Sequence, residues 1–130
     1  MKKILLTNLF LVFSILLSAQ CYETLTFGGS HTIGQKPDGT LWGWGLGANG
    51  QLMTTNTVEA HPIQLGVVTD WSTIENGTEN TFVIKNDGTL WGCGRNLYGN
   101  LGINSTTLTN TIFQQITTAN NWVKVSASAY

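Results

Sequence analysis

The chain has 130 residues, a formal net charge of −1, and only 10% charged residues. Four of its six cationic side chains lie after residue 20, together with all seven acidic ones, so this larger part is mildly acidic. A surface of this kind lacks the basic patch that nucleic-acid binding requires, and we expect no nucleic-acid partner.

The first twenty residues have the organisation of a secretory signal peptide. A charged start, Met1–Lys3, precedes an apolar run over 4–17, which ends in the small and polar residues 18–20. This run is shorter than the roughly 20 residues that a transmembrane helix needs. We therefore expect a signal helix over 1–20, a secreted or cell-surface protein, and no stable membrane span once the signal is removed. An uncleaved membrane anchor is the alternative.

The two cysteines are Cys21 and Cys93. An exported protein could join them in a disulfide or keep both as free thiols, and a count of two does not decide between these states. Lipid attachment at Cys21 is disfavoured, because Gln20 stands where a bacterial lipoprotein needs a small residue.

A ten-residue motif occurs twice. Residues 36–45 read KPDGTLWGWG, and residues 85–94 read KNDGTLWGCG, an offset of 49. Two further pairs of segments continue the match at offsets of 49 and 51, namely 50–52 with 99–101 and 70–74 with 121–125. We expect the two extra residues in the polar stretch 104–110, because length changes collect in loops. A period of this length is typical of propellers, solenoids and arrays.

The turn inside each copy predicts a β-hairpin. Both Pro37-Asp38-Gly39 and Asn86-Asp87-Gly88 suit a type I turn that is followed by a left-handed glycine. We expect the aspartate of each turn to cap its own backbone. In the second copy, the strand 81–85 should therefore turn back into a strand over 89–93.

Further short apolar stretches, at 63–68 and 71–74 after the first hairpin, bring the count to about four strands per unit. No segment after residue 20 carries apolar residues at helical spacing over ten positions, and the 15 glycines disfavour helices further. We expect an all-β fold, a partial β-propeller of about two four-stranded blades. The propeller region would cover 21–130, with repeat units near 22–70 and 71–121 and the start of a third at 122–130.

The repeated pattern D-G-T-L-W-x-x-G, followed by G-x-N-x-x-G-x-L-G, resembles the repeat of the regulator of chromosome condensation family, which is also common in exported bacterial proteins. The second unit carries the pattern at 87–91, Gly94, Asn96, Gly99, Leu101 and Gly102. The first unit departs at Gly47, where the pattern has Asn, and at Met53, where it has Gly. The resemblance implies a ring of seven blades, of which this chain would be an amino-terminal fragment. A short protein that completes its ring by self-association is the alternative.

Few residues suggest chemistry. The stretch 45–50 matches the dinucleotide-binding spelling G-x-G-x-x-G, but the residues after it make a poor helix start, and we expect no cofactor. His31 and His61 have no second histidine or cysteine at a spacing typical of zinc sites, so we expect no metal. His31 falls at a strand start where the second unit has Asn80, which favours a structural hydrogen bond. We predict no catalytic residues in this chain.

We expect an exported, non-catalytic module for protein or glycan binding and adhesion. Polar loops at one rim of the propeller would form the contact surface, at 54–60 and 104–110. The candidate contact residues are Thr54, Asn56, Glu59, Asn104, Thr107 and Asn110. The alternative is the propeller part of a secreted enzyme whose catalytic residues lie in a further C-terminal portion. Other partners would be further propeller repeats or a second copy of the chain.

Overall fold

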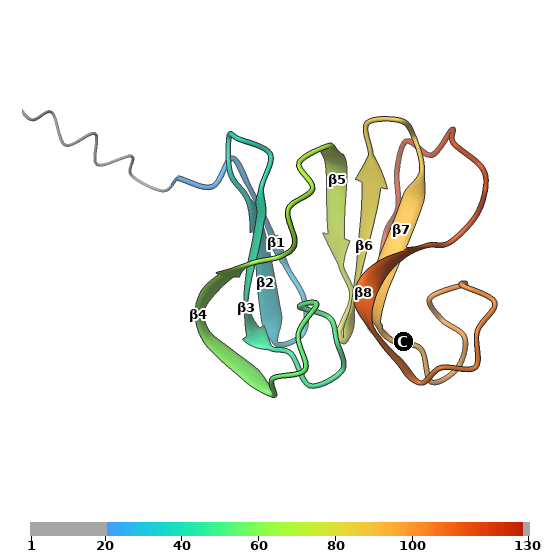
Figure 1. The fold of residues 1–130 in the computed structure, drawn as a ribbon, viewed down its shortest axis with the longest axis horizontal. Helices are drawn as coiled ribbons and strands as arrows, with labels where there is room; N and C mark the ends of the chain where they lie inside the picture. Colours follow the sequence, from blue (N-terminus) through green and yellow to red (C-terminus); the bar gives the residue numbers. More distant parts are fainter. Residues whose placement is uncertain (1–20, 129–130) are drawn as a thin grey trace, which may run out of the picture.

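A computed structural model describes residues 21–128 of the chain (Figure 1). The expected signal helix over 1–20 and the last two residues of the expected third unit lie outside this range. The described residues form eight strands in two four-stranded antiparallel sheets, and they contain no helix. The predicted all-β fold with two four-stranded blades is confirmed. None of the described residues forms a helix that is long and apolar enough to cross a membrane.

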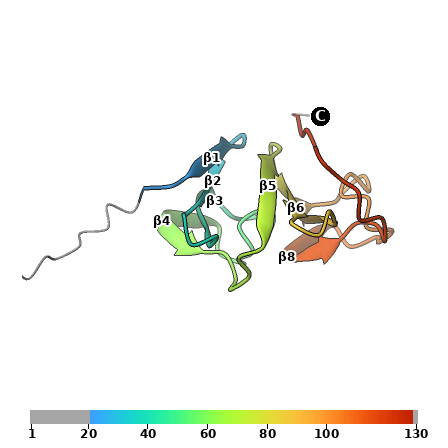
Figure 2. The ribbon, with the colours of Figure 1, turned by 90° about the horizontal axis from the view of Figure 1, so that it is seen from above.

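Within each sheet the strands neighbour one another in chain order. The first sheet contains β1 (Thr24–Phe27), β2 (His31–Gln35), β3 (Leu41–Leu46) and β4 (Val58–Gln64). The second contains β5 (Trp71–Asn76), β6 (Asn80–Lys85), β7 (Leu90–Arg95) and β8 (Thr109–Gln115). Figure 2 shows the two sheets beside each other, with β5 of the second sheet next to the first. Strand β5 contacts both β1 and β2.

The two sheets repeat the same strand register. Ile33 pairs with Gly43 in the first hairpin, and the equivalent Phe82 pairs with Gly92 in the second. Between β3 and β4, Gly45 pairs with Glu59, fourteen residues later. Between β7 and β8, the equivalent Gly94 pairs with Asn110, sixteen residues later. The two extra residues of the second unit therefore lie in the β7–β8 loop, where the sequence predicts them.

Two strand predictions need correction. The strand expected at 63–68 is β4, which instead ends at Gln64 and begins at Val58. Its exposed edge residues give little apolar signal, whereas Leu65, only 2% exposed, belongs to the link between the sheets and packs into the core. The apolar stretch at 71–74 is the first strand of the second sheet, and β1 takes that place in the first sheet.

The apolar core lies between the two sheets. Its buried members are Ile33, Leu41, Leu52, Leu65, Trp71, Ile74 and Val83. The first four come from the first unit and the last three from the second, so neither sheet buries this face alone. Burying one such side chain contributes roughly 1.5–3 kcal/mol. Contact between neighbouring units therefore contributes to stability, as in other repeat proteins.

Candidate functional site

The aspartate that occurs in both turns takes part in a local hydrogen-bond network. In the first hairpin, the backbone N and Oγ1 of Thr40 donate to Asp38 Oδ1, at 2.9 and 2.6 Å. Trp42 Nε1 in turn donates to Thr40 Oγ1 at 2.9 Å. Gly39 follows with a φ of 82°, in the left-handed region that the turn type requires. The predicted hairpin and its aspartate cap are confirmed.

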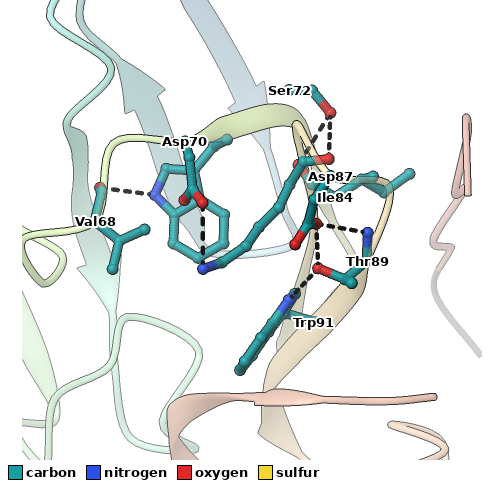
Figure 3. A network of polar contacts seen from close by, with 9 residues as sticks. Val68, Asp70, Ser72, Ile84, Asp87, Thr89 and Trp91 are labelled. Atoms are coloured by element: carbon teal, nitrogen blue, oxygen red, sulfur yellow. Dashed lines mark hydrogen bonds and ion pairs between the residues drawn. The ribbon is translucent and has the colours of Figure 1, made fainter. Parts of the chain in front are cut away.

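The second hairpin repeats this network (Figure 3). Thr89 donates through its backbone N and Oγ1 to Asp87 Oδ1 at 3.0 and 2.6 Å, and Trp91 Nε1 donates to Thr89 Oγ1 at 2.8 Å. The bond from the Thr89 hydroxyl is the main cause that lowers the pKa of Asp87. The hydrogen bond of the tryptophan was not predicted from the sequence, although the two-residue spacing of Thr and Trp places both side chains on one face of a strand. These motif residues therefore stabilise the hairpin.

A lysine lies over the tryptophan in both hairpins. Lys36 Nζ is 3.5 Å from the ring centroid of Trp42, and Lys85 Nζ is 4.9 Å from that of Trp91. Lys85 also approaches Asp70 Oδ2 at 3.5 Å, in the link that leads to β5. Cation–π contacts of this kind add stability at the turn end of each sheet.

The contact surface predicted from the sequence lies at the opposite end of the sheets, on the loops that follow β3 and β7 (Figure 1). In the first loop, Glu59 Oε1 accepts hydrogen bonds from Thr54 Oγ1 at 3.0 Å and from Asn56 Nδ2 at 2.8 Å. Thr54 Oγ1 also accepts from the backbone N of Asn56. The candidate residues Thr54 and Asn56 of this loop therefore form one polar cluster with Glu59, and Asn56 is exposed.

In the second loop, a buried asparagine holds the chain in place. Asn96, 2% exposed, donates through Nδ2 to the carbonyls of Ser105 and Thr107, both at 3.1 Å. Its Oδ1 accepts from the backbone N of Leu101 at 3.0 Å. Asn104, with a φ of 48°, and Thr107 are exposed on this loop. The loop therefore presents ordered polar side chains.

Two of the six candidates lie on strands and not in loops. Glu59 belongs to β4 and Asn110 to β8, because both strands begin earlier than the sequence suggests. Asn110 also reaches the first unit, since its carbonyl O lies 2.7 Å from the position that a Cβ on Gly50 would take. Its side chain donates to Gln114 Oε1 at 3.1 Å. Asn110 therefore also contributes to the contact between the two units.

The departure at Gly47 has a local cause, and the departure at Met53 keeps the backbone conformation of the pattern's glycine. A Cβ on Gly47 would lie 2.7 Å from both Asn56 O and Thr54 Cγ2, so the shorter first loop leaves no room for the asparagine of the pattern. Met53 has a φ of 52° where its equivalent Gly102 has 69°, so it holds a left-handed conformation that favours glycine. Residues 48–57 form turns and bends, and no helix begins after Gly50. The loop therefore lacks the helix N-terminus that a dinucleotide site uses.

The two cysteines and the first histidine take structural positions. Cys21 is exposed and Cys93 is buried, and both are free thiols. Burial raises the pKa of the Cys93 thiol. His31, 3% exposed, meets Thr81 across the two sheets at 3.1 Å, which agrees with the predicted structural hydrogen bond. Among the described residues, no three His, Cys, Asp or Glu side chains gather as metal ligands.

Comparison with known proteins finds similarity at the level of structure. No protein-family model matches the chain, and no curated protein matches its sequence. Yeast RCC1 (Prp20) bound to Kap60 is 19% identical with a TM-score of 0.75, over 83% of this chain and 28% of that one. Prp20p from Saccharomyces cerevisiae, in a structure described with its binding to Gsp1p and histones, is 18% identical with the same TM-score, over 83% and 29%.

Human WBSCR16 is also similar, at 18% identity and a TM-score of 0.65, over 72% of this chain and 25% of that protein. The chain spans between a quarter and a third of the length of these three structures. Similarity at this identity establishes the fold. The described residues therefore have the fold of two consecutive blades of a β-propeller of the kind seen in yeast RCC1.

Proposed function

We propose that the chain is part of an exported propeller of the regulator of chromosome condensation type, and that it binds a partner protein through the rim formed by the β3–β4 and β7–β8 loops. The likeness to yeast RCC1 carries this proposal, because that protein is described in complex with Kap60 and with binding to Gsp1p and histones. Propellers commonly place their binding residues on loops that a rigid sheet positions.

The construction of the rim supports a binding role. Thr54 and Asn56 are fixed by Glu59, and Thr107 is fixed by Ser105, whose Oγ accepts from the backbone N of Thr107 at 3.1 Å. Loops that are already ordered lose little conformational entropy when they bind a partner. Asn56, Asn104 and Thr107 are exposed and available for contact.

We also propose export, from the signal-like residues 1–20, and a role without catalysis in this part of the chain. Expression in a bacterial host, followed by amino-terminal sequencing of the secreted fraction, tests export. A mature chain that begins near Cys21 supports it, and a chain that stays in the cytoplasm with Met1 in place contradicts it. A protein is the expected partner, and a glycan is the alternative.

Array binding with matched variants tests the rim. The purified chain is applied to arrays of extracellular proteins and of glycans. Asn56→Ala and Thr107→Ala are the rim variants. Thr118→Ala is the control, because Thr118 is exposed but lies outside the β3–β4 and β7–β8 loops. A protein ligand whose binding is lost in both rim variants and kept in the control supports the proposal. Binding to glycans alone, or binding that the rim variants leave unchanged, contradicts it.

A further inference from the structure

A small apolar pocket lies where the two blades meet. Its volume is about 220 Å³, below the roughly 300–1,000 Å³ of pockets that take drug-sized ligands, so it suits a smaller molecule. The lining residues come from both blades and fall between positions 53 and 113, so neither end of the chain bounds the pocket. They are Met53, Leu65, Gly66, Val68, Trp71, Lys85, Trp91, Ile112 and Phe113.

Hydrogen bonds hold the aromatic walls of this pocket in place. Trp71 Nε1 donates to Val68 O at 2.9 Å (Figure 3), and Trp91 Nε1 donates to Thr89 Oγ1 at 2.8 Å. The ring of Phe113 packs against that of Trp71, with 5.2 Å between the ring centroids. Both indole N–H groups are therefore already bonded, and the rings offer apolar surface to a ligand. Walls that are fixed in advance lose little conformational entropy on binding.

Lys85 supplies the one charged group among the residues that line the pocket. Its Nζ lies 5.1 Å from the ring centroid of Trp71 and 4.9 Å from that of Trp91. The carboxylate of Asp70 approaches this Nζ at 3.5 Å, but Asp70 does not line the pocket. Because an ammonium group has three N–H donors, Lys85 can bind a second anion that enters from the pocket. The charge of the pocket therefore favours an anionic ligand.

The pocket is open to solvent beside two aliphatic side chains. Val68 is 39% exposed and Ile112 is 60% exposed, and both line the pocket. An apolar group that entered here would cover surface that water otherwise contacts, which favours binding. The ligand that fits these walls is therefore apolar at one end and negatively charged at the other.

We propose that this pocket binds a small organic acid in which a short chain joins an apolar or aromatic group to a carboxylate. The apolar group packs against Trp71, Trp91 and Phe113, and the carboxylate accepts hydrogen bonds from Lys85 Nζ. Both a free acid and the C-terminal residue of a peptide have this chemistry. The pocket contains none of the six candidate contact residues of the rim, so this site goes beyond the function proposed above.

Calorimetric titration of the purified chain with hydrocinnamate tests the class of ligand. We expect this acid to bind, and we expect the neutral hydrocinnamide to bind at least about tenfold more weakly, because the amide has the same shape but lacks the charge that Lys85 recognises. The tripeptide glycyl-glycyl-phenylalanine carries the same phenyl group and carboxylate at the end of a peptide. Tighter binding of the tripeptide identifies a peptide C-terminus as the natural source of the ligand, and tighter binding of hydrocinnamate identifies a free acid.

Two pairs of variants locate the binding. Lys85→Met removes the cation and should weaken the binding of hydrocinnamate at least about tenfold. Lys36→Met is its matched control, because Lys36 lies over Trp42 in the equivalent hairpin and does not line the pocket. Ile112→Asp places an anion at the exposed mouth of the pocket and should abolish binding. Val123→Asp adds the same charge at an exposed position outside the pocket and should leave binding unchanged.

The comparison of acid and amide uses the unaltered chain, so it remains decisive even if Lys85→Met lowers the stability of the fold. The proposal is overturned if hydrocinnamate fails to bind at about 1 mM, where even a weak complex would be half formed. Equal binding of the acid and the amide overturns it as well, and so does undiminished binding to Lys85→Met or to Ile112→Asp.

Discussion

His31 of the first blade and Thr81 of the second are joined across the two sheets, with His31 Nε2 at 3.1 Å from Thr81 Oγ1. Thr81 gives its only hydroxyl hydrogen to Gln51 O at 2.9 Å, so the histidine Nε2–H is the donor in this pair. Nδ1 is then unprotonated, and it is buried without a hydrogen-bond partner in the described part of the chain. Burial lowers the pKa of His31 from 6.5 to about 4.

Stability should therefore fall as the pH falls from 6.5 to 4. The folded chain resists protonation of His31, whereas the unfolded chain accepts the proton more readily. The stability that the neutral His31 contributes is therefore fully present above pH 6.5 and is lost as the pH falls to about 4. The difference in pKa corresponds to about 3 kcal/mol of unfolding free energy. Urea denaturation between pH 7.5 and 4 measures this slope.

The matched control for this slope is His31→Asn, because Asn80 holds the equivalent position in the second blade. This variant should be less stable than the parent at pH 7.5, since it changes the contact with Thr81. Its stability should nevertheless depend much less on pH over the same window. An equal slope in both proteins would show that His31 is not the titrating group.

The aspartate and threonine of a turn should act as one unit. Asp87→Ala and Thr89→Val should each lower the free energy of unfolding, because each removes hydrogen bonds of the cap. The double variant should cost less than the sum of the two, since Thr89 Oγ1 links Asp87 to Trp91. Chemical denaturation of the four proteins gives the coupling energy, and strict additivity would contradict a linked network.

Substitutions of the equivalent threonines Thr81 and Thr32, near the start of each hairpin, should differ in their effect on the free energy of unfolding. Thr81→Val should destabilise the chain by about 2 kcal/mol, because it removes the buried hydroxyl that both the Gln51 carbonyl and the His31 ring contact. Thr32→Val is the matched control, since Thr32 occupies the equivalent strand position and is only half-buried. This control should stay within about 0.5 kcal/mol of the parent. Equal losses would show that the bond between the blades contributes little, and thermal unfolding followed by circular dichroism measures both.

The hairpins could be predicted from the sequence because their signals are local. The turn Asn86-Asp87-Gly88 sets its own backbone, and Gly88 has the left-handed φ of 79° that the turn type requires. Strand β4 was misplaced because its edge position leaves most side chains exposed, so apolar content points to Leu65 instead. An edge strand is defined by its backbone pairing, which a single sequence does not reveal.

The candidate site was predicted in outline only. The loops after β3 and β7 lie at one end of the sheets, as the repeat implies, but the link between Asn56 and Glu59 depends on how the loop folds back. The different surroundings of the equivalent residues Gly50 and Gly99 had no sequence signal, because a repeat does not show what packs against each copy. The repeat identifies equivalent residues, and coordinates are needed to show how their surroundings differ.

The equivalent glycines Gly50 and Gly99 allow the contact between the blades to be measured apart from backbone strain. Both have positive φ, so an alanine at either position costs about 1 kcal/mol in strain. Gly50→Ala also drives a methyl group toward Asn110 O, at 2.7 Å, whereas Gly99→Ala meets open space. We expect Gly50→Ala to lose about 1–3 kcal/mol more than Gly99→Ala. If urea denaturation gave the same loss for both, the strand β8 would have to be free to move away from the first blade, and the close contact between the two units would not contribute to stability.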